Sequence, residues 1–169
     1  MRLSNRAAFA AIFLACAALI GIAMYMQEQL GLEPCPMCIL QRYAFMALGL
    51  VALVAAIHGP GVAATKAYSG LVLVFAIAGA GTSMRHSYLQ RFPSDTQSCG
   101  ADLEFLVNNF SLAQAFPKIF AGTGECAKVQ WRMLGLSIPE WAFVWFVLFA
   151  AVAVWLAVRK SGSRPHFRN

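Results

Sequence analysis

The chain of 169 residues is 60% hydrophobic and only 12% charged, a balance that excludes an ordinary soluble globular protein. Its net charge of +6 does not indicate a nucleic-acid-binding surface, because many of the basic residues flank apolar runs long enough to cross a bilayer. We therefore predict an all-α membrane protein that forms a single domain over residues 1–169.

Four apolar runs predict four transmembrane helices that pack as a bundle. The first run could be a secretory signal, but it is longer than a usual signal core, so we expect it to remain as a membrane span. A short loop at 27–38 and a long loop at 85–140 connect the first to the second and the third to the fourth span. The predicted spans are 7–26, 39–57, 67–84 and 141–158.

The distribution of charge predicts how these spans are oriented. Arg2 and Arg6 precede the first span, Lys66 lies between the second and third, and four basic residues follow the fourth. All seven acidic residues lie in the other segments. By the positive-inside rule, both termini and the Lys66 loop are cytoplasmic, and the two other loops face outward.

Two cysteines lie three residues apart where the second span begins. With Cys35 as N-cap and Pro36 as the first helical residue, Cys38 falls in the first turn, where unpaired N–H groups and the helix dipole stabilise a thiolate. Arg42 follows at i+4 on the same face, and its guanidinium would stabilise the thiolate further or hold an electron-accepting partner. The pattern predicts a redox site in the segment Glu33-Pro34-Cys35-Pro36-Met37-Cys38-Ile39-Leu40-Gln41-Arg42.

Other interpretations of this pair are a structural crosslink, half of a metal site, or two unrelated buried thiols. A disulfide that closes so small a ring contributes about 2 kcal/mol or less, which is a weak reason for a crosslink. Zinc needs two further ligands, and because the sequence offers no matching Cys-x-x-Cys or His pair, we predict no metal. Gln41 and Arg42 are candidates for function because polar groups inside a membrane helix are costly, although Arg42 could also be an interfacial anchor.

His86 follows the third span at roughly the depth of Cys38. An imidazole there could transfer the protons that accompany electrons, or it could be an ordinary interfacial residue. Within the third span, small residues such as Gly79 and Gly81 predict close helix packing. Cys16, inside the first span, is expected to act as a small buried hydrophobe.

The long outward loop contains Cys99 and Cys126. A disulfide of that span would contribute roughly 3 to 4 kcal/mol, so these cysteines could simply tie the loop down. The presence of Cys35 and Cys38 on the same side favours a second role, because two adjacent disulfides can exchange by thiolate attack.

Together these residues resemble the DsbB family, the bacterial inner-membrane disulfide bond formation proteins. The resemblance covers nearly the whole chain and is specific because several separate motifs agree, whereas the first cysteine pair alone would not be. The motifs are Cys35-Pro36-Met37-Cys38 with Arg42, His86-Ser87-Tyr88-Leu89-Gln90, Cys99, Cys126, Gln130-Trp131 and Gly135-Leu136-Ser137-Ile138-Pro139-Glu140-Trp141.

The resemblance implies a thiol:quinone oxidoreductase of the bacterial inner membrane whose redox loops are periplasmic. A reduced DsbA-type thiol oxidase with a thioredoxin fold would attack Cys99 of a Cys99–Cys126 disulfide, and Cys126 would then attack Cys35. Cys38 would be released as the thiolate that donates electrons to ubiquinone or menaquinone.

The resemblance also implies roles for three residues beside the cysteines. Arg42 would stabilise the charge-transfer pair formed by the thiolate and the quinone, and His86 would line the quinone site. The family often has an acidic residue where this chain has Gln41, which leaves no basis for a proton relay at that position.

Two alternatives differ in class. A vitamin K epoxide reductase-like enzyme is also a small helical bundle with a Cys-x-x-Cys motif and a quinone, but there the motif follows the loop cysteines, whereas here it precedes them. A non-enzymatic membrane protein with two structural disulfides would reduce no quinone.

Overall fold

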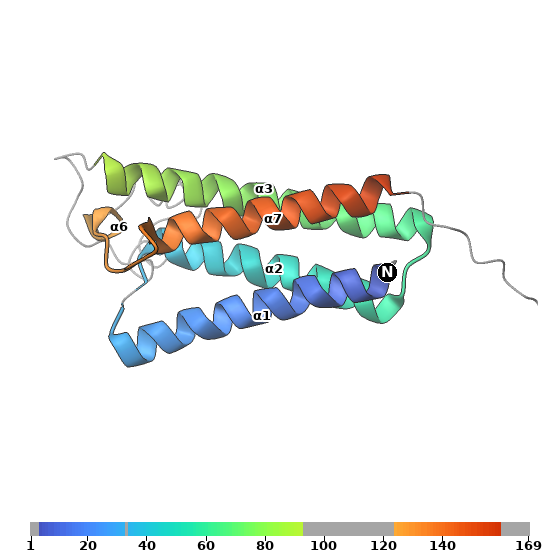
Figure 1. Cartoon of the computed structure of the whole chain (residues 1–169), viewed down its shortest axis with the longest axis horizontal. Coiled ribbons are helices and arrows are strands. Elements are labelled where there is room, and N and C mark those ends of the chain that lie inside the picture. Colours follow the sequence, from blue (N-terminus) through green and yellow to red (C-terminus); the bar gives the residue numbers. More distant parts are fainter. Residues whose placement is uncertain (1–3, 33, 93–123, 160–169) are drawn as a thin grey trace, which may run out of the picture.

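Four long helices run back and forth along one axis (Figure 1). The structure is a computed structural model that describes residues 4–32, 34–92 and 124–159. Each of these helices is long and apolar enough to cross a membrane, which confirms the predicted all-α membrane fold. The helices are α1 (Asn5–Leu30), α2 (Pro36–His58), α3 (Val62–Arg91) and α7 (Ile138–Val158).

The helix ends follow local sequence signals. Cys35 is the N-cap of α2 and Pro36 its first residue, as predicted, because the fixed φ of proline suits that position. Helices α1 and α2 end at Gly31 and Gly59, whose φ values of 61° and 62° place them in the left-handed region that favours glycine. Ser137 caps α7, and its backbone N–H donates to the Glu140 carboxylate at 2.8 Å in a capping box.

Helix α3 is longer than its predicted span. The apolar run ends near Arg85, yet the helix continues to Arg91. The reason is that its inward face remains buried in this region, through His86 and Leu89, while Arg91 forms an ion pair with Glu140 at the start of α7. The long connection between the third and fourth spans therefore begins after α3, at about residue 92, and not at 85.

The core lies between α2, α3 and α7, with one half of α1 added to it. Phe45 stacks on Phe146 with ring centroids 3.9 Å apart, and Gly79 allows the ring of Phe146 to lie against the backbone of α3. The buried residues of α1 end at Cys16, and beyond it this helix diverges from α2 (Figure 1). Cys16 is itself 3% exposed and packs in the core, as predicted for a small hydrophobe.

Between α3 and α7 the structure describes a short helix and a two-stranded hairpin. Helix α6 (Gly124–Ala127) is followed by β1 (Arg132–Met133) and β2 (Leu136–Ser137), which pair in antiparallel fashion around a turn at Leu134 and Gly135. These elements lie at the end of the bundle where α2 begins, opposite to the N-terminus (Figure 1). Cys99 lies outside the described residues.

Candidate active site

Three helices bring cysteine and histidine side chains together at one end of the bundle. Cys35 and Cys38 come from the start of α2, His86 from the last turns of α3, and Cys126 from α6. Cys35 and Cys126 belong to a small apolar cluster with Met37 and Leu89, separate from the main core. The sulfur atoms therefore lie in a compact, largely apolar environment at the mouth of α2.

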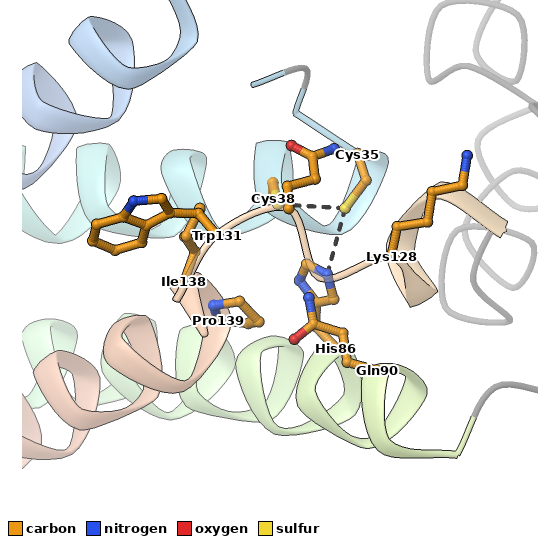
Figure 2. A pocket seen from close by; sticks show the side chains of 9 residues that line it. Cys35, Cys38, His86, Gln90, Lys128, Trp131, Ile138 and Pro139 are labelled. Atoms are coloured by element: carbon orange, nitrogen blue, oxygen red, sulfur yellow. Dashed lines mark hydrogen bonds between the residues drawn. The ribbon is translucent and has the colours of Figure 1, made fainter. Parts of the chain in front are cut away.

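The distances within this group are short. Cys35 Sγ lies 3.4 Å from Cys38 Sγ and 3.6 Å from His86 Nε2 (Figure 2). The sulfur of Cys126 lies within 4.8 Å of both Cys35 Sγ and one His86 ring nitrogen. Cys35, His86 and Cys126 are buried, at 6%, 2% and 0% exposure, whereas Cys38 is half-buried. Cys35 and Cys38 are free thiols in this structure.

Gln41 contacts the other ring nitrogen of His86. Its side-chain nitrogen lies 3.3 Å from His86 Nδ1, and both side chains are buried. The two ring nitrogens of His86 therefore face different partners, Gln41 on one side and Cys35 on the other. Which group donates depends on the tautomer of His86.

The side chain of Arg42 makes its hydrogen bonds to α1. Its guanidinium donates to the Gln27 side-chain oxygen at 2.6 Å and to the Ala23 carbonyl at 3.2 Å, and also contacts Met24 Sδ at 3.6 Å, all on α1. Within the part of the chain that the structure describes, Arg42 is not among the residues that line the pocket beside Cys38. Its predicted role toward an electron acceptor stays a prediction.

A small pocket, partly open to the outside, lies beside the sulfur atoms. Cys35, Cys38 and His86 line it from α2 and α3, and Trp131, Ile138 and Pro139 gather on its opposite side (Figure 2). The pocket thus joins hydrogen-bonding and thiol groups to an apolar wall. This composition is suited to a planar, largely apolar ring with polar substituents.

Part of this wall could be anticipated and part could not. Gln90, Gln130, Trp131, Ile138 and Pro139 belong to the motifs on which the family resemblance rests, and the structure places all five at the pocket. Lys128 also lines it, two residues after Cys126. No sequence signal distinguishes this lysine from an ordinary exposed one.

The chain matches known proteins over almost its whole length. Residues 5–156 match the sequence model of the family described as disulfide bond formation protein DsbB. The disulfide bond formation protein B of Aromatoleum aromaticum is 49% identical, over 94% of this chain and 96% of its own. The proteins of the same name from Azoarcus sp. and Chromobacterium violaceum are 43% and 44% identical, over 90% and 95% of this chain and 92% and 97% of theirs. The chain therefore belongs to the DsbB family of disulfide bond formation proteins.

Proposed function

We propose that this membrane protein is a thiol:quinone oxidoreductase that reoxidises a periplasmic DsbA-type dithiol oxidase and passes the electrons to a membrane quinone. The observation that carries the proposal is the meeting of Cys35, Cys38, Cys126 and His86 beside an apolar-walled pocket at one end of a membrane-spanning bundle. Membership of the DsbB family supports a role in disulfide bond formation. The arrangement of these residues supports thiol:quinone oxidoreduction as the reaction.

The thiol chemistry begins with two exchange steps, and the partner is reoxidised when its second thiolate attacks the mixed disulfide and Cys99 leaves as a thiolate. A thiolate of the soluble partner attacks Cys99 of a Cys99–Cys126 disulfide, that bond breaks, and Cys126 leaves as a thiolate. Cys126 then attacks Cys35 of a Cys35–Cys38 disulfide, and Cys38 leaves as a thiolate. Each step forms one S–S bond and breaks one, so neither consumes an oxidant. The second step is supported by the approach of Cys126 Sγ to within 4.8 Å of Cys35 Sγ.

The pocket beside Cys38 has a lining suited to a quinone head group. Trp131, Ile138 and Pro139 offer apolar contacts to one side of a ring. When bound, ubiquinone or menaquinone would supply a two-electron acceptor that also takes up two protons.

Cys38, His86 and Arg42 would favour the transfer of electrons to the quinone. Cys38 lies in the first turn of α2, where the backbone N–H groups favour its thiolate form. His86 lines the same pocket and contacts Cys35, so it is placed to take up or release a proton as the sulfur changes its protonation state. The charge of Arg42 would favour the thiolate from the α1 side, although no contact joins it to the pocket.

The proposal includes an orientation in the bacterial inner membrane. Helix α1 begins at the end of the bundle opposite to the start of α2 (Figure 1). Because basic residues gather at the Asn5 end, the positive-inside rule assigns that end to the cytoplasm and the cysteine end to the periplasm.

Quinone reduction by the purified protein tests the proposal directly. With a reduced DsbA-type dithiol as donor, the full-length chain in detergent should bleach the absorbance of a short-chain ubiquinone, and Cys38→Ala should abolish both the turnover and any thiolate–quinone absorbance. Cys16→Ala is the matched control, because this thiol is buried in the core of the bundle and should leave turnover unchanged. A wild-type protein that reduces no quinone would support a purely structural role, and turnover that survives Cys38→Ala would remove Cys38 as donor.

A further inference from the structure

We propose that Cys35, Cys126 and His86 form a binding site for a thiophilic divalent cation such as Zn²⁺ when both cysteines are reduced. One ligand atom from each residue lies within 4.8 Å of the other two. All three side chains are buried, yet Cys35 and His86 also line the open pocket, which gives an ion a path to the site.

The separations agree with zinc geometry. A tetrahedral zinc ion with Zn–S of about 2.3 Å and Zn–N of about 2.0–2.1 Å holds sulfur and nitrogen about 3.6 Å apart and two sulfur atoms about 3.8 Å apart. Cys35 Sγ and His86 Nε2 are 3.6 Å apart. Cys126 Sγ, within 4.8 Å of both, is within about 1 Å of the separations that zinc requires.

Gln41 supplies the supporting contact that metal-binding histidines usually have. An amide can present either its NH₂ group or its oxygen to His86 Nδ1, which lies 3.3 Å from the Gln41 nitrogen. With the oxygen turned toward the ring, Gln41 accepts from Nδ1–H, and the lone pair of Nε2 is then directed toward Cys35. A single rotation of the amide thus converts the imidazole from a donor to the Cys35 sulfur into a metal ligand.

The two cysteine thiolates also balance the charge of the bound ion. Two thiolates neutralise a divalent cation, so the occupied site carries no net charge despite its burial. Binding releases two protons, one from each thiol, and changes no oxidation state. Cys38 Sγ lies 3.4 Å from Cys35 Sγ but outside the group of three, so solvent from the pocket takes the fourth position.

The site would depend on redox state. A disulfide at Cys35 or Cys126 removes a ligand, so only the reduced protein binds the ion. While the ion is bound, neither sulfur can attack or be attacked, and disulfide exchange stops. This inhibition rests on the proposed function, but metal binding itself does not.

Titration of the full-length protein with Co²⁺ tests the inference. The protein, purified in detergent and reduced with a phosphine that is then removed under anaerobic conditions, should bind one Co²⁺ per chain. We expect thiolate-to-cobalt charge-transfer absorbance together with the visible bands of a tetrahedral ion, both lost when Zn²⁺ is added. The same preparation after oxidation should give neither signal, and this control needs no substitution.

Variants then identify the ligands. Cys126→Ala and His86→Ala should each lose the tetrahedral signal, Gln41→Leu should weaken binding about 10–100-fold by removing the supporting contact, and Cys16→Ala should bind like the wild type. Circular dichroism and gel filtration establish that each variant is folded. The inference is overturned if the reduced wild type gives no signal, if the oxidised protein gives the same one, or if the signal survives Cys126→Ala and His86→Ala. The titration contains neither quinone nor partner, so its outcome is independent of whether quinone is reduced.

Discussion

Gln41 and Arg42 are consecutive residues of α2, yet they contact opposite neighbours. Gln41 is buried against His86 of α3, whereas the guanidinium of Arg42 is bound to α1 through Gln27 and the Ala23 carbonyl. Successive residues of an α-helix point about 100° apart, so one residue can serve the buried site while the next serves the outer face. The charge of Arg42 therefore acts from the α1 side, and Gln41 acts through the imidazole.

Arg42→Ala should weaken quinone affinity. The substitution removes a positive charge near the start of α2 that does not line the pocket. A partly exposed charge of this kind is worth about 0.3–1 kcal/mol, so the Kd should rise about two- to fivefold. Quinone titration monitored by the thiolate–quinone absorbance measures the change.

Gln27→Ala provides the matched control for Arg42. It deletes the 2.6 Å contact to the guanidinium but leaves the charge in place. Its quinone affinity should stay close to that of the wild type. If both variants bind quinone equally well, Arg42 is only an anchor between α1 and α2.

At the scale of the elements, one aromatic layer joins three helices. Phe45 of α2 stacks on Phe146 of α7, and Phe146 lies directly against Gly79 of α3. A Cβ atom at Gly79 would overlap the ring of Phe146, which the stacking on Phe45 restricts from moving. The absence of a side chain at this position is therefore a condition for α3 and α7 to pack as closely as they do, as expected for small residues in membrane helices.

Gly79→Ala should destabilise the bundle by about 1–3 kcal/mol, because a well-packed core has to move to accept the added methyl group. Gly81→Ala, two residues further along the same helix, should change stability by less than about 0.5 kcal/mol, since an added Cβ there meets nothing within 4 Å. Thermal unfolding in detergent measures both variants. Equal transition temperatures would show that the ring of Phe146 can yield.

At the scale of the whole molecule, the two ends of the bundle differ in chemistry. At one end, Asn5 of α1 donates to Thr65 of α3 at 3.0 Å and accepts a hydrogen bond from Arg159 after α7. At the other end lie the hairpin of β1 and β2 and the group formed by Cys35, Cys38, Cys126 and His86. The fold thus puts these two groups on opposite sides of any membrane that the helices cross.

Cysteine labelling should show which side is which. Val62→Cys, at the start of α3, and Met133→Cys, in β1, replace side chains of matched exposure, 46% and 45%, and each is made in a chain whose native cysteines are replaced. A membrane-impermeant maleimide should label Met133→Cys in right-side-out vesicles and Val62→Cys only after permeabilisation, because the positive-inside rule assigns the two ends to opposite sides. The reverse labelling pattern would place Cys35 and Cys38 on the cytoplasmic side and would exclude a periplasmic partner.

Sequence patterns were most informative where the cause is local. Hydropathy predicted the four helices, and proline chemistry predicted Cys35 as N-cap of α2. The extension of α3 was missed because Arg85 interrupts the apolar run while Leu89 continues the buried face. Beyond Arg85 the local sequence pattern no longer indicates a membrane helix, and tertiary packing determines where α3 ends.

The contacts within the site depend on tertiary packing. The Gln41–His86 contact joins residues 45 positions apart, and the Cys35–His86 contact joins residues 51 apart. Both depend on how α2 and α3 are rotated about their axes, which no spacing within one helix determines. For the same reason, sequence spacing shows no further ligands near Cys35 and Cys38, whereas the fold brings His86 and Cys126 to Cys35. The absence of a metal stays a prediction.

The complete enclosure of Cys126 restricts which molecules can deliver reducing equivalents. This sulfur has no exposed surface, and Cys35 is only 6% exposed, so a folded donor outside the membrane cannot align its own thiolate with either atom. Under the proposed function, the partner would instead react with another cysteine, the role that the family resemblance gives to Cys99. Under the proposed function, this burial would protect Cys35 and Cys126 from unrelated thiol proteins.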